Sequence, residues 1–160
     1  QEYNTIDVRH ILARVDSSSL DKKSDTYEQD LADLKAQKKA EAEKIYQEWK
    51  DGEATEESFA ALADKYSADS PEGGLYTQVY HNMMVTEFND WCFDAARQPG
   101  DTDIVETTYG YHIMYFVGQD LPYWQVRVTN TLKTNDFNDW YKGLQQDYIV
   151  TEGSGMKFVG

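Results

Sequence analysis

Two alternating apolar segments, far apart in the sequence, constrain the fold of this chain more than any other feature. Residues 5–14 (TIDVRHILAR) and residues 109–116 (YGYHIMYF) place apolar side chains at every second position, which predicts two strands with a buried face. Each apolar face also carries one histidine, His10 in the first segment and His112 in the second. If the two strands are neighbours in one sheet, the imidazoles can meet. If they are not, each is an ordinary core histidine.

The residues between these segments show both helical and extended patterns. Helices are predicted over residues 26–50, from Thr55 to about Tyr66, and over 86–97, with a short strand over 75–79 and a strand DIVETT that forms a hairpin with 109–116. In the first helix Lys38 interrupts the apolar stripe, so only the second half is expected to pack. Thr55, followed by two glutamates, is the expected N-cap of the second helix. This order predicts an α+β domain in which a small sheet carries helices.

A second amphipathic pattern follows residue 118. Over residues 134–149 an aromatic stripe predicts a helix, behind three candidate capping residues; the stripe is Phe137, Trp140, Tyr141, Leu144 and Tyr148, and the caps are Thr134, Asn135 and Asp136. The preceding YWQVRVTNTL fits a strand by its branched residues and a helix by its spacing, so both assignments stay open.

Composition argues against several classes of partner. The chain has 160 residues and a formal net charge of -14, which argues against nucleic acid and anionic membranes because no net positive field attracts phosphates. No apolar run reaches the roughly 18 residues that span a bilayer. The single cysteine, Cys92, excludes an internal disulfide and is expected to be buried. Since the sequence starts at Gln1 without methionine, we expect a piece of a longer protein.

Four motifs in register resemble one known family. VRHIL, FAALADKYSADSPEGG, NMMVTEFNDWCFDAARQPGD and IVETTYGYHIMYF are together similar to the parvulin-type (PpiC, rotamase) peptidyl-prolyl cis–trans isomerases, over residues 5–118. The resemblance implies a four-stranded, mainly antiparallel sheet flanked by helices, to which the C-terminal amphipathic helix is an addition. Residues 119–160 are then expected to be a helical extension, part of a chaperone-like region completed by N-terminal sequence that is missing here.

The resemblance also implies the site residues. Transferred position by position, the catalytic set is His10, Asp69, Thr107 and His112, and the proline-binding set is Tyr76, Met84 and Phe88. The family's Gly-Gly-Asp-Leu-Gly element is only partly kept, because Leu75, Tyr76 and Thr77 follow the two glycines. Rotation about an Xaa-Pro bond makes and breaks no covalent bond. The resemblance therefore implies no nucleophile, no cofactor and no metal.

Each assignment has a structural alternative. Met84 and Phe88 could be ordinary core residues, Asp69 could be a turn former, and Thr107 could be a plain strand residue. His81, in a polar loop, has no counterpart in the family and is expected to face solvent.

Two functions from different classes follow. The first is an isomerase that acts on unfolded or proline-containing polypeptides. The second is a chaperone or peptide-binding module that keeps the groove but catalyses poorly. Similarity in layout to secreted foldases of the PrsA and SurA kind implies an extracytoplasmic location, with a membrane reached only through a missing anchor. A homodimer through the C-terminal helix is a third, separate possibility.

Overall fold

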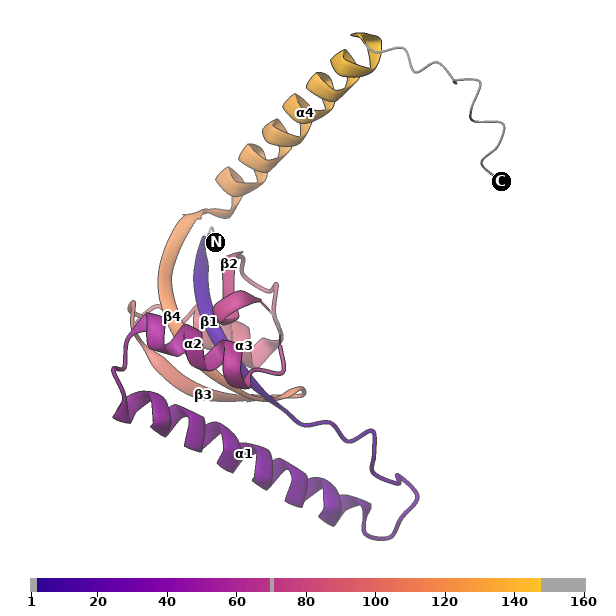
Figure 1. Ribbon diagram of the computed structural model, residues 1–160, viewed down its shortest axis with the longest axis vertical. Coiled ribbons are helices and arrows are strands. Elements are labelled where there is room, and N and C mark those ends of the chain that lie inside the picture. The colour runs from indigo at the N-terminus through magenta and orange to yellow at the C-terminus, as the bar shows by residue number, and fades with distance from the viewer. Residues whose placement is uncertain (1–2, 70, 148–160) are drawn as a thin grey trace, which may run out of the picture. The chain divides into compact units, whose positions relative to one another are not determined.

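The computed structural model describes residues 3–69 and 71–147, which belong to two compact units, Gln1–Tyr123 and Trp124–Gly160. The elements in chain order are β1 (Asn4–Arg14), α1 (Tyr27–Asp51), α2 (Glu56–Tyr66), a short 3-10 turn (Glu72–Gly74), β2 (Leu75–Val79), α3 (Thr86–Cys92), β3 (Thr102–Thr107), β4 (Gly110–Pro122) and α4 (Tyr123–Asp147). Figure 1 shows the sheet of the first unit with its helices.

The sheet has four strands in the order β2-β1-β4-β3, and every neighbouring pair is antiparallel. The first predicted strand and the last therefore lie side by side at its centre, with His10 opposite Met114 and Leu12 opposite His112. The expected α+β class, the four-stranded antiparallel sheet and the β3–β4 hairpin are confirmed.

One face of the sheet packs against α1 and α2. Its core consists of buried apolar side chains from the odd-numbered positions of the central strands and from both helices: Ile11, Ala13, Ala42, Ile45, Trp49, Phe59, Ala63, Tyr111 and Ile113. Only the second half of α1 contributes, as its interrupted stripe predicts. The Trp49 indole N–H donates to the Thr55 carbonyl at 2.9 Å, which ties the end of α1 to the start of α2.

The second helix begins as its sequence predicts. The Thr55 hydroxyl accepts from the Ser58 amide at 3.1 Å, and the Ser58 hydroxyl oxygen accepts from the Thr55 amide at 3.1 Å. This capping box satisfies amides at the helix start that have no partner inside the helix.

The other face of the sheet packs against α3. Its core draws on even-numbered positions of the same two strands together with β2 and α3: Ile6, Val8, Val79, Phe88, Trp91, Cys92, Met114 and Phe116. Cys92 is buried, as expected, and burial raises the pKa of its thiol to about 12. His10 and His112 lie on this face, since they share the parity of Val8 and Met114.

Helix α3 is shorter than predicted. It ends at Cys92, whereas the sequence pattern suggested a helix to residue 97. Beyond Phe93 the Asp94 carboxylate accepts from the Ala96 amide at 2.9 Å, so a local turn replaces the next helical turn.

Helix α4 is longer than predicted at its start. It begins at Tyr123, so the ambiguous segment YWQVRVTNTL is helical, and the three residues proposed as caps lie inside the helix. The Thr134 hydroxyl donates to the carbonyl of Asn130 one turn earlier, at 2.9 Å, in place of capping a helix start. Tyr148 and the predicted end at residue 149 lie outside the described residues.

The exposed aromatic face of α4 is present. Phe137 stacks with Tyr141 at 6.2 Å between ring centroids, and both rings are about half exposed, as is Trp140. Among the helices of the described chain, none combines the length and apolar character needed to cross a bilayer.

Candidate active site

The two strand histidines meet within the sheet. His10 and His112 are diagonal neighbours on β1 and β4, and their Nδ1 atoms lie 3.2 Å apart in a buried hydrogen bond. Exposure is 3% for His10 and 5% for His112. Burial is the main cause that lowers the pKa of each imidazole to about 4, with the neighbouring His112 adding to the effect on His10 and Asp69 opposing it on both. Both rings are therefore neutral near pH 7.

Asp69 and Tyr76 extend this contact on one side. The His10 Nε2 lies 3.3 Å from Asp69 Oδ2, and the Tyr76 hydroxyl donates to the same oxygen at 2.8 Å. The Asp69 side chain is about a third exposed, whereas His10 is closed off by the Tyr76 ring, stacked 5.1 Å away, and by the edge of Phe88.

Thr107 extends the contact on the other side. Its hydroxyl lies 2.9 Å from His112 Nε2, and the amide of Tyr109 donates to the same hydroxyl oxygen at 3.1 Å. Thr107 ends β3, so the hairpin that pairs β3 with β4 also brings this hydroxyl to the histidine.

Asp69 as a carboxylate gives these hydrogen bonds a single direction. A carboxylate has no proton to donate, so at 3.3 Å its negative charge favours a proton on the facing His10 Nε2, and the neutral ring then accepts at Nδ1. His112 then donates from Nδ1 and accepts at Nε2 from the Thr107 hydroxyl, which in turn accepts from the Tyr109 amide. We name these five residues the histidine network: His10, Asp69, Tyr76, Thr107 and His112. All four sequence-predicted catalytic residues lie in it.

The loop that carries Asp69 is tied to the central strand. The Ala68 amide donates to the Leu12 carbonyl at 3.0 Å, and the Ser67 hydroxyl accepts from the Leu12 amide at 3.1 Å. Further along, Gly74 passes so close to the backbone of His10 that a Cβ would collide with the His10 carbonyl oxygen. The family-like Gly-Gly pair thus permits the close approach that brings both Asp69 and Tyr76 to His10.

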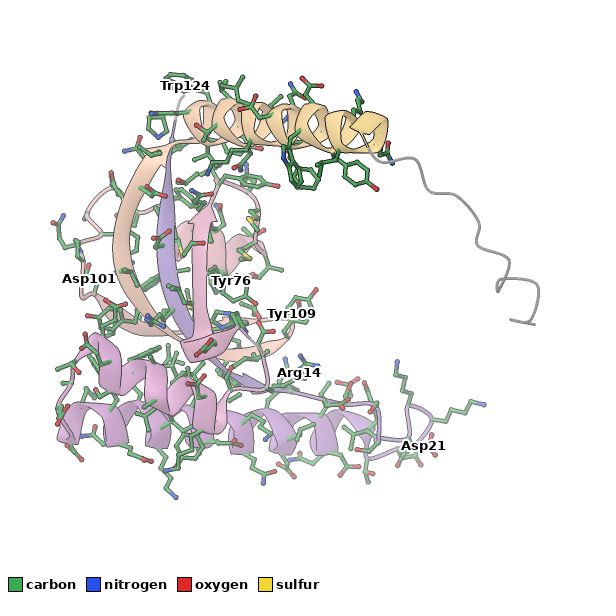
Figure 2. The ribbon with its side chains drawn as sticks, turned by 45° about the horizontal axis from the view of Figure 1, so that its top comes forward. Arg14, Asp21, Tyr76, Asp101, Tyr109 and Trp124 are labelled. Carbon is green, nitrogen blue, oxygen red and sulfur yellow. The ribbon has the colours of Figure 1, made fainter. Side chains whose placement is uncertain are left out.

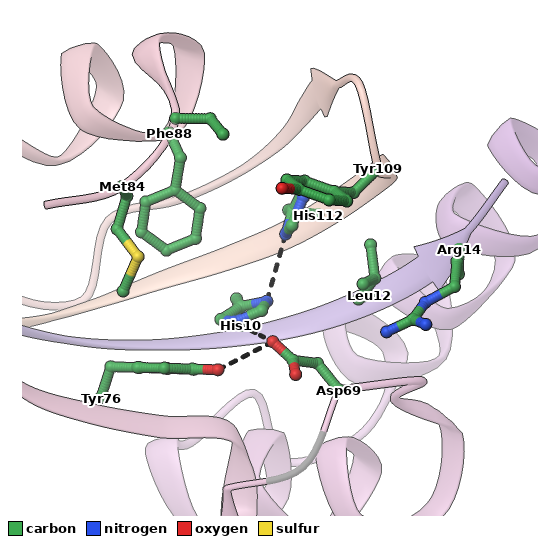
Figure 3. Close-up of a pocket in the computed structure, with 10 residues that line it drawn as sticks. His10, Leu12, Arg14, Asp69, Tyr76, Met84, Phe88, Tyr109 and His112 are labelled. Atoms are coloured by element: carbon green, nitrogen blue, oxygen red, sulfur yellow. Dashed lines mark hydrogen bonds and ion pairs between the residues drawn. The ribbon is translucent and has the colours of Figure 1, made fainter.

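A cleft of about 210 Å³ opens over the network. Met84 and Phe88 line one end of it and Arg14 the other, with the two histidines between them (Figure 3). Phe88 is 2% exposed and belongs to the core on the α3 side of the sheet, and it also lines the cleft, while its role in binding proline stays a prediction.

The cleft is also lined by four residues that the sequence motifs did not indicate as site residues: Leu12, Arg14, Val85 and Tyr109. Period two from His10 along β1 gives Leu12 and Arg14, so that signal was available. Tyr109 was harder to predict because it lies just before β4 and is 58% exposed at the rim (Figure 2).

The structure corrects the expectation for His81. His81 does not simply face solvent, because its ring stacks on Tyr3 at 4.2 Å and meets the edge of Phe93 at 5.1 Å. Within the part of the chain that the structure describes, no group of three or more His, Cys, Asp and Glu side chains is arranged to hold a metal ion.

Comparison with protein families identifies the class. The model for the PPIC-type PPIase domain matches residues 1–119. The chain therefore belongs to the family of PPIC-type peptidyl-prolyl cis–trans isomerases, and the resemblance inferred from its four motifs is confirmed.

Solved structures share this fold. Peptidylprolyl isomerase (PrsA) from Bacillus anthracis is 25% identical over 82% of this chain and 49% of its own, with a TM-score of 0.50. PrsA from Bacillus subtilis is 23% identical over 96% of this chain and 54% of its own, with a TM-score of 0.55. The chain thus spans about half the length of these proteins. Comparison with curated protein sequences gave no match.

Proposed function

We propose that this chain catalyses cis–trans isomerisation of Xaa-Pro bonds in unfolded extracytoplasmic polypeptides, without covalent chemistry. One observation carries the proposal: an apolar slot made by Met84, Phe88 and the ring of Tyr76 lies directly over the buried histidine network. The extracytoplasmic location rests on the similarity to foldases of the PrsA and SurA kind. Recovery of the native protein from the cytoplasmic fraction of its cells would refute that part.

The slot would act by treating the planar and twisted amides differently. Resonance in the planar amide creates a barrier of about 18–20 kcal/mol, and the twisted amide has lost that resonance and part of its carbonyl dipole. Transfer from water into an apolar slot therefore costs the planar amide more free energy than the twisted amide. A thousandfold acceleration needs a reduction of only about 4 kcal/mol in this barrier.

The network would supply fixed electrostatics next to this slot. Asp69, a carboxylate at the cleft wall, repels the partial negative charge of a carbonyl oxygen, and this charge is larger in the planar amide. Neutral His112 and Thr107 hold the imidazole of His10, which faces the carboxylate, in one orientation. The surroundings therefore need not rearrange as the Xaa-Pro bond rotates. In this scheme the histidines are positioning residues and transfer no proton.

The test is catalysis of exchange in an Ala-Xaa-Pro-Phe peptide, followed by NMR line shapes. We expect Asp69→Ala to lower kcat/KM by well over tenfold while the protein stays folded, because the side chain is partly exposed. Asp33→Ala, which removes an exposed carboxylate from α1, is the matched control and should leave the rate unchanged. An exchange rate equal to the uncatalysed one at high protein concentration would eliminate the enzyme proposal.

A second function, holding of unfolded clients, is favoured by the exposed aromatic face of α4. Phe137, Trp140 and Tyr141 together expose a large apolar surface on one helix. Replacing all three by serine should abolish suppression of client aggregation, measured by light scattering, and leave peptide isomerisation intact. If suppression persists in that variant, α4 is not the holding surface. A shift from dimer to monomer in the same variant, measured by sedimentation, would instead support dimerisation through this helix.

A further inference from the structure

Tyr76 differs from the leucine that is usual at its place in the family, and its hydroxyl makes a specific contact. The oxygen that it contacts, Asp69 Oδ2, also faces His10 Nε2, so the Tyr76 hydroxyl and one imidazole nitrogen meet at the same carboxylate oxygen. The Tyr76 ring meanwhile stacks over His10 with an interplanar angle of 27°. A leucine could line the slot equally well, but it could neither donate a hydrogen bond nor stack as a flat ring.

The contact matters because the histidine network has two possible proton orders. With Asp69 ionised, each N–H and O–H group of the histidine network points toward the Asp69 end of the network. If Asp69 were protonated it could donate to His10 Nε2, and His10 would then donate from Nδ1 to His112. His112 would donate from Nε2 to the Thr107 hydroxyl, whose own proton would have to turn away. The same heavy-atom positions can thus hold opposite tautomers.

Tyr76 favours the first of these orders. The hydrogen bond from the Tyr76 hydroxyl stabilises negative charge on Asp69 Oδ2, the oxygen that also faces His10 Nε2 at 3.3 Å. Burial, and then the hydrogen bond to Asp69, raises the pKa of the Tyr76 hydroxyl to about 12, so this group remains a donor at physiological pH. The other charged or titratable groups that line the same cleft are His10, His112, Arg14 and Tyr109.

We propose that Tyr76 is a positioning residue of the isomerase site: its hydroxyl holds Asp69 as an oriented carboxylate and so fixes one tautomer in each histidine. The proposal deepens the proposed function, on which its catalytic consequence rests. Its structural part, the tautomer order, can be measured without catalysis.

The experiment compares the intact chain with Tyr76→Phe, which deletes only the hydroxyl, and with Tyr76→Leu, which restores the usual family residue. Tyr46→Phe is the matched control, since it deletes a hydroxyl whose 2.8 Å hydrogen bond to Thr102 lies on the α1 side of the sheet. Imidazole ¹⁵N shifts, recorded from neutral to acidic pH, report which nitrogen of each ring carries the proton. Amide ¹H–¹⁵N spectra confirm that each variant is folded.

In the unaltered chain we expect His10 to carry its proton on Nε2 and His112 on Nδ1. In Tyr76→Phe and Tyr76→Leu this pattern should break down at a pH that is higher by roughly half a unit or more, because the carboxylate has lost one hydrogen bond. The acid limb of kcat/KM should move by the same amount, and Tyr46→Phe should leave both unchanged. Titrations of Tyr76→Phe that match the unaltered chain would overturn the proposal. An unaltered chain without isomerase activity would refute the proposed function, while the tautomer measurement would still decide the role of Tyr76.

Discussion

The two faces of the central sheet are built from the same two strands and yet differ in character. Residues such as Ile11 and Ile113 point toward α1 and α2 and form an apolar core. One residue along each strand, His10 and His112 point the other way, into a core that opens on a cleft. Alternation along a strand thus lets one pair of strands serve packing on one face and a polar site on the other.

The apolar surroundings of His10 and His112 explain how this buried polar pair is maintained. On the α3 face the apolar neighbours remove water from both imidazoles and lower their pKa values, so the rings stay neutral and can bond to each other. The α1–α2 face carries a cluster of buried apolar side chains without a histidine. We therefore expect changes on the two faces to separate stability from activity.

The largest expected effect tests the apolar face. Phe59 is fully buried there, and Phe59→Ala should lower the free energy of unfolding by about 3–5 kcal/mol, because the large side chain leaves a cavity. Denaturant unfolding measures the loss. The isomerase rate per folded molecule should remain that of the unaltered chain, and a parallel loss of rate would mean that the two faces are not separable.

Gly74 lies where the loop that carries the site approaches the sheet. Its φ of +64° and its contact with the His10 carbonyl leave no room for a side chain, so Gly74→Ala should cost roughly 2–3 kcal/mol of stability. Unlike Phe59→Ala, it should also lower kcat/KM, since Gly74 lies between Asp69 in the loop and Tyr76 on β2. Gly143→Ala, at a helical position with open space around it, is the matched control: it should leave kcat/KM unchanged and should not lower stability, because alanine favours a helix more than glycine does.

Acid should destabilise the protein through the α3 face, which carries the two buried histidines. The pKa of each buried imidazole is lowered from 6.5 to about 4, so the unfolded chain binds more protons between these values and stability falls as pH falls through that window. Between about pH 7 and pH 5 the loss should be on the order of 2 kcal/mol for each histidine, by thermal or denaturant unfolding.

The paired variant His10→Gln/His112→Gln should lose less stability over the same pH range, because glutamine does not titrate. His81→Gln, outside the network, should keep the original dependence. An equal slope in all three proteins would show that the buried pair does not cause the acid sensitivity.

The smallest expected effect lies at the start of α2. Thr55→Ala removes half of the capping box and should lower the free energy of unfolding by about 1 kcal/mol. Since α2 packs on the apolar face, kcat/KM should not change. Ser19→Ala, in the loop after β1, offers a comparison in which no helix start is affected.

The fold could be predicted from the sequence where periodicity was long and unbroken. The alternation around His10 and His112 gave both central strands, and the glycine turn before His112 gave the hairpin. The helix limits were less predictable: α3 ends early because the Asp94 side chain forms a local turn, and in the first part of α4 the helical spacing of YWQVRVTNTL prevails over the strand preference of its branched residues.

The site could be predicted only in part. Family-like motifs located His10, Asp69, Thr107 and His112, and the structure brings all four together, although their catalytic roles stay predictions. The hydrogen bond from the Tyr76 hydroxyl to Asp69 could not be predicted, because it depends on how the loop between the two residues folds back against β1. No local pattern in the sequence encodes that long-range geometry.

The most direct test of the account is a methyl NMR titration with an Ala-Xaa-Pro-Phe peptide, using the same peptide with alanine in place of proline as the reference. We predict that the Met84 methyl shifts on addition of the proline peptide only, with exchange between two bound forms, while the methyls of Ile45 and Ile113 on the opposite face do not move. An unmoved Met84 methyl at saturating peptide, or shifts centred on the α1–α2 face, would contradict the claim that the histidine face is the isomerase site.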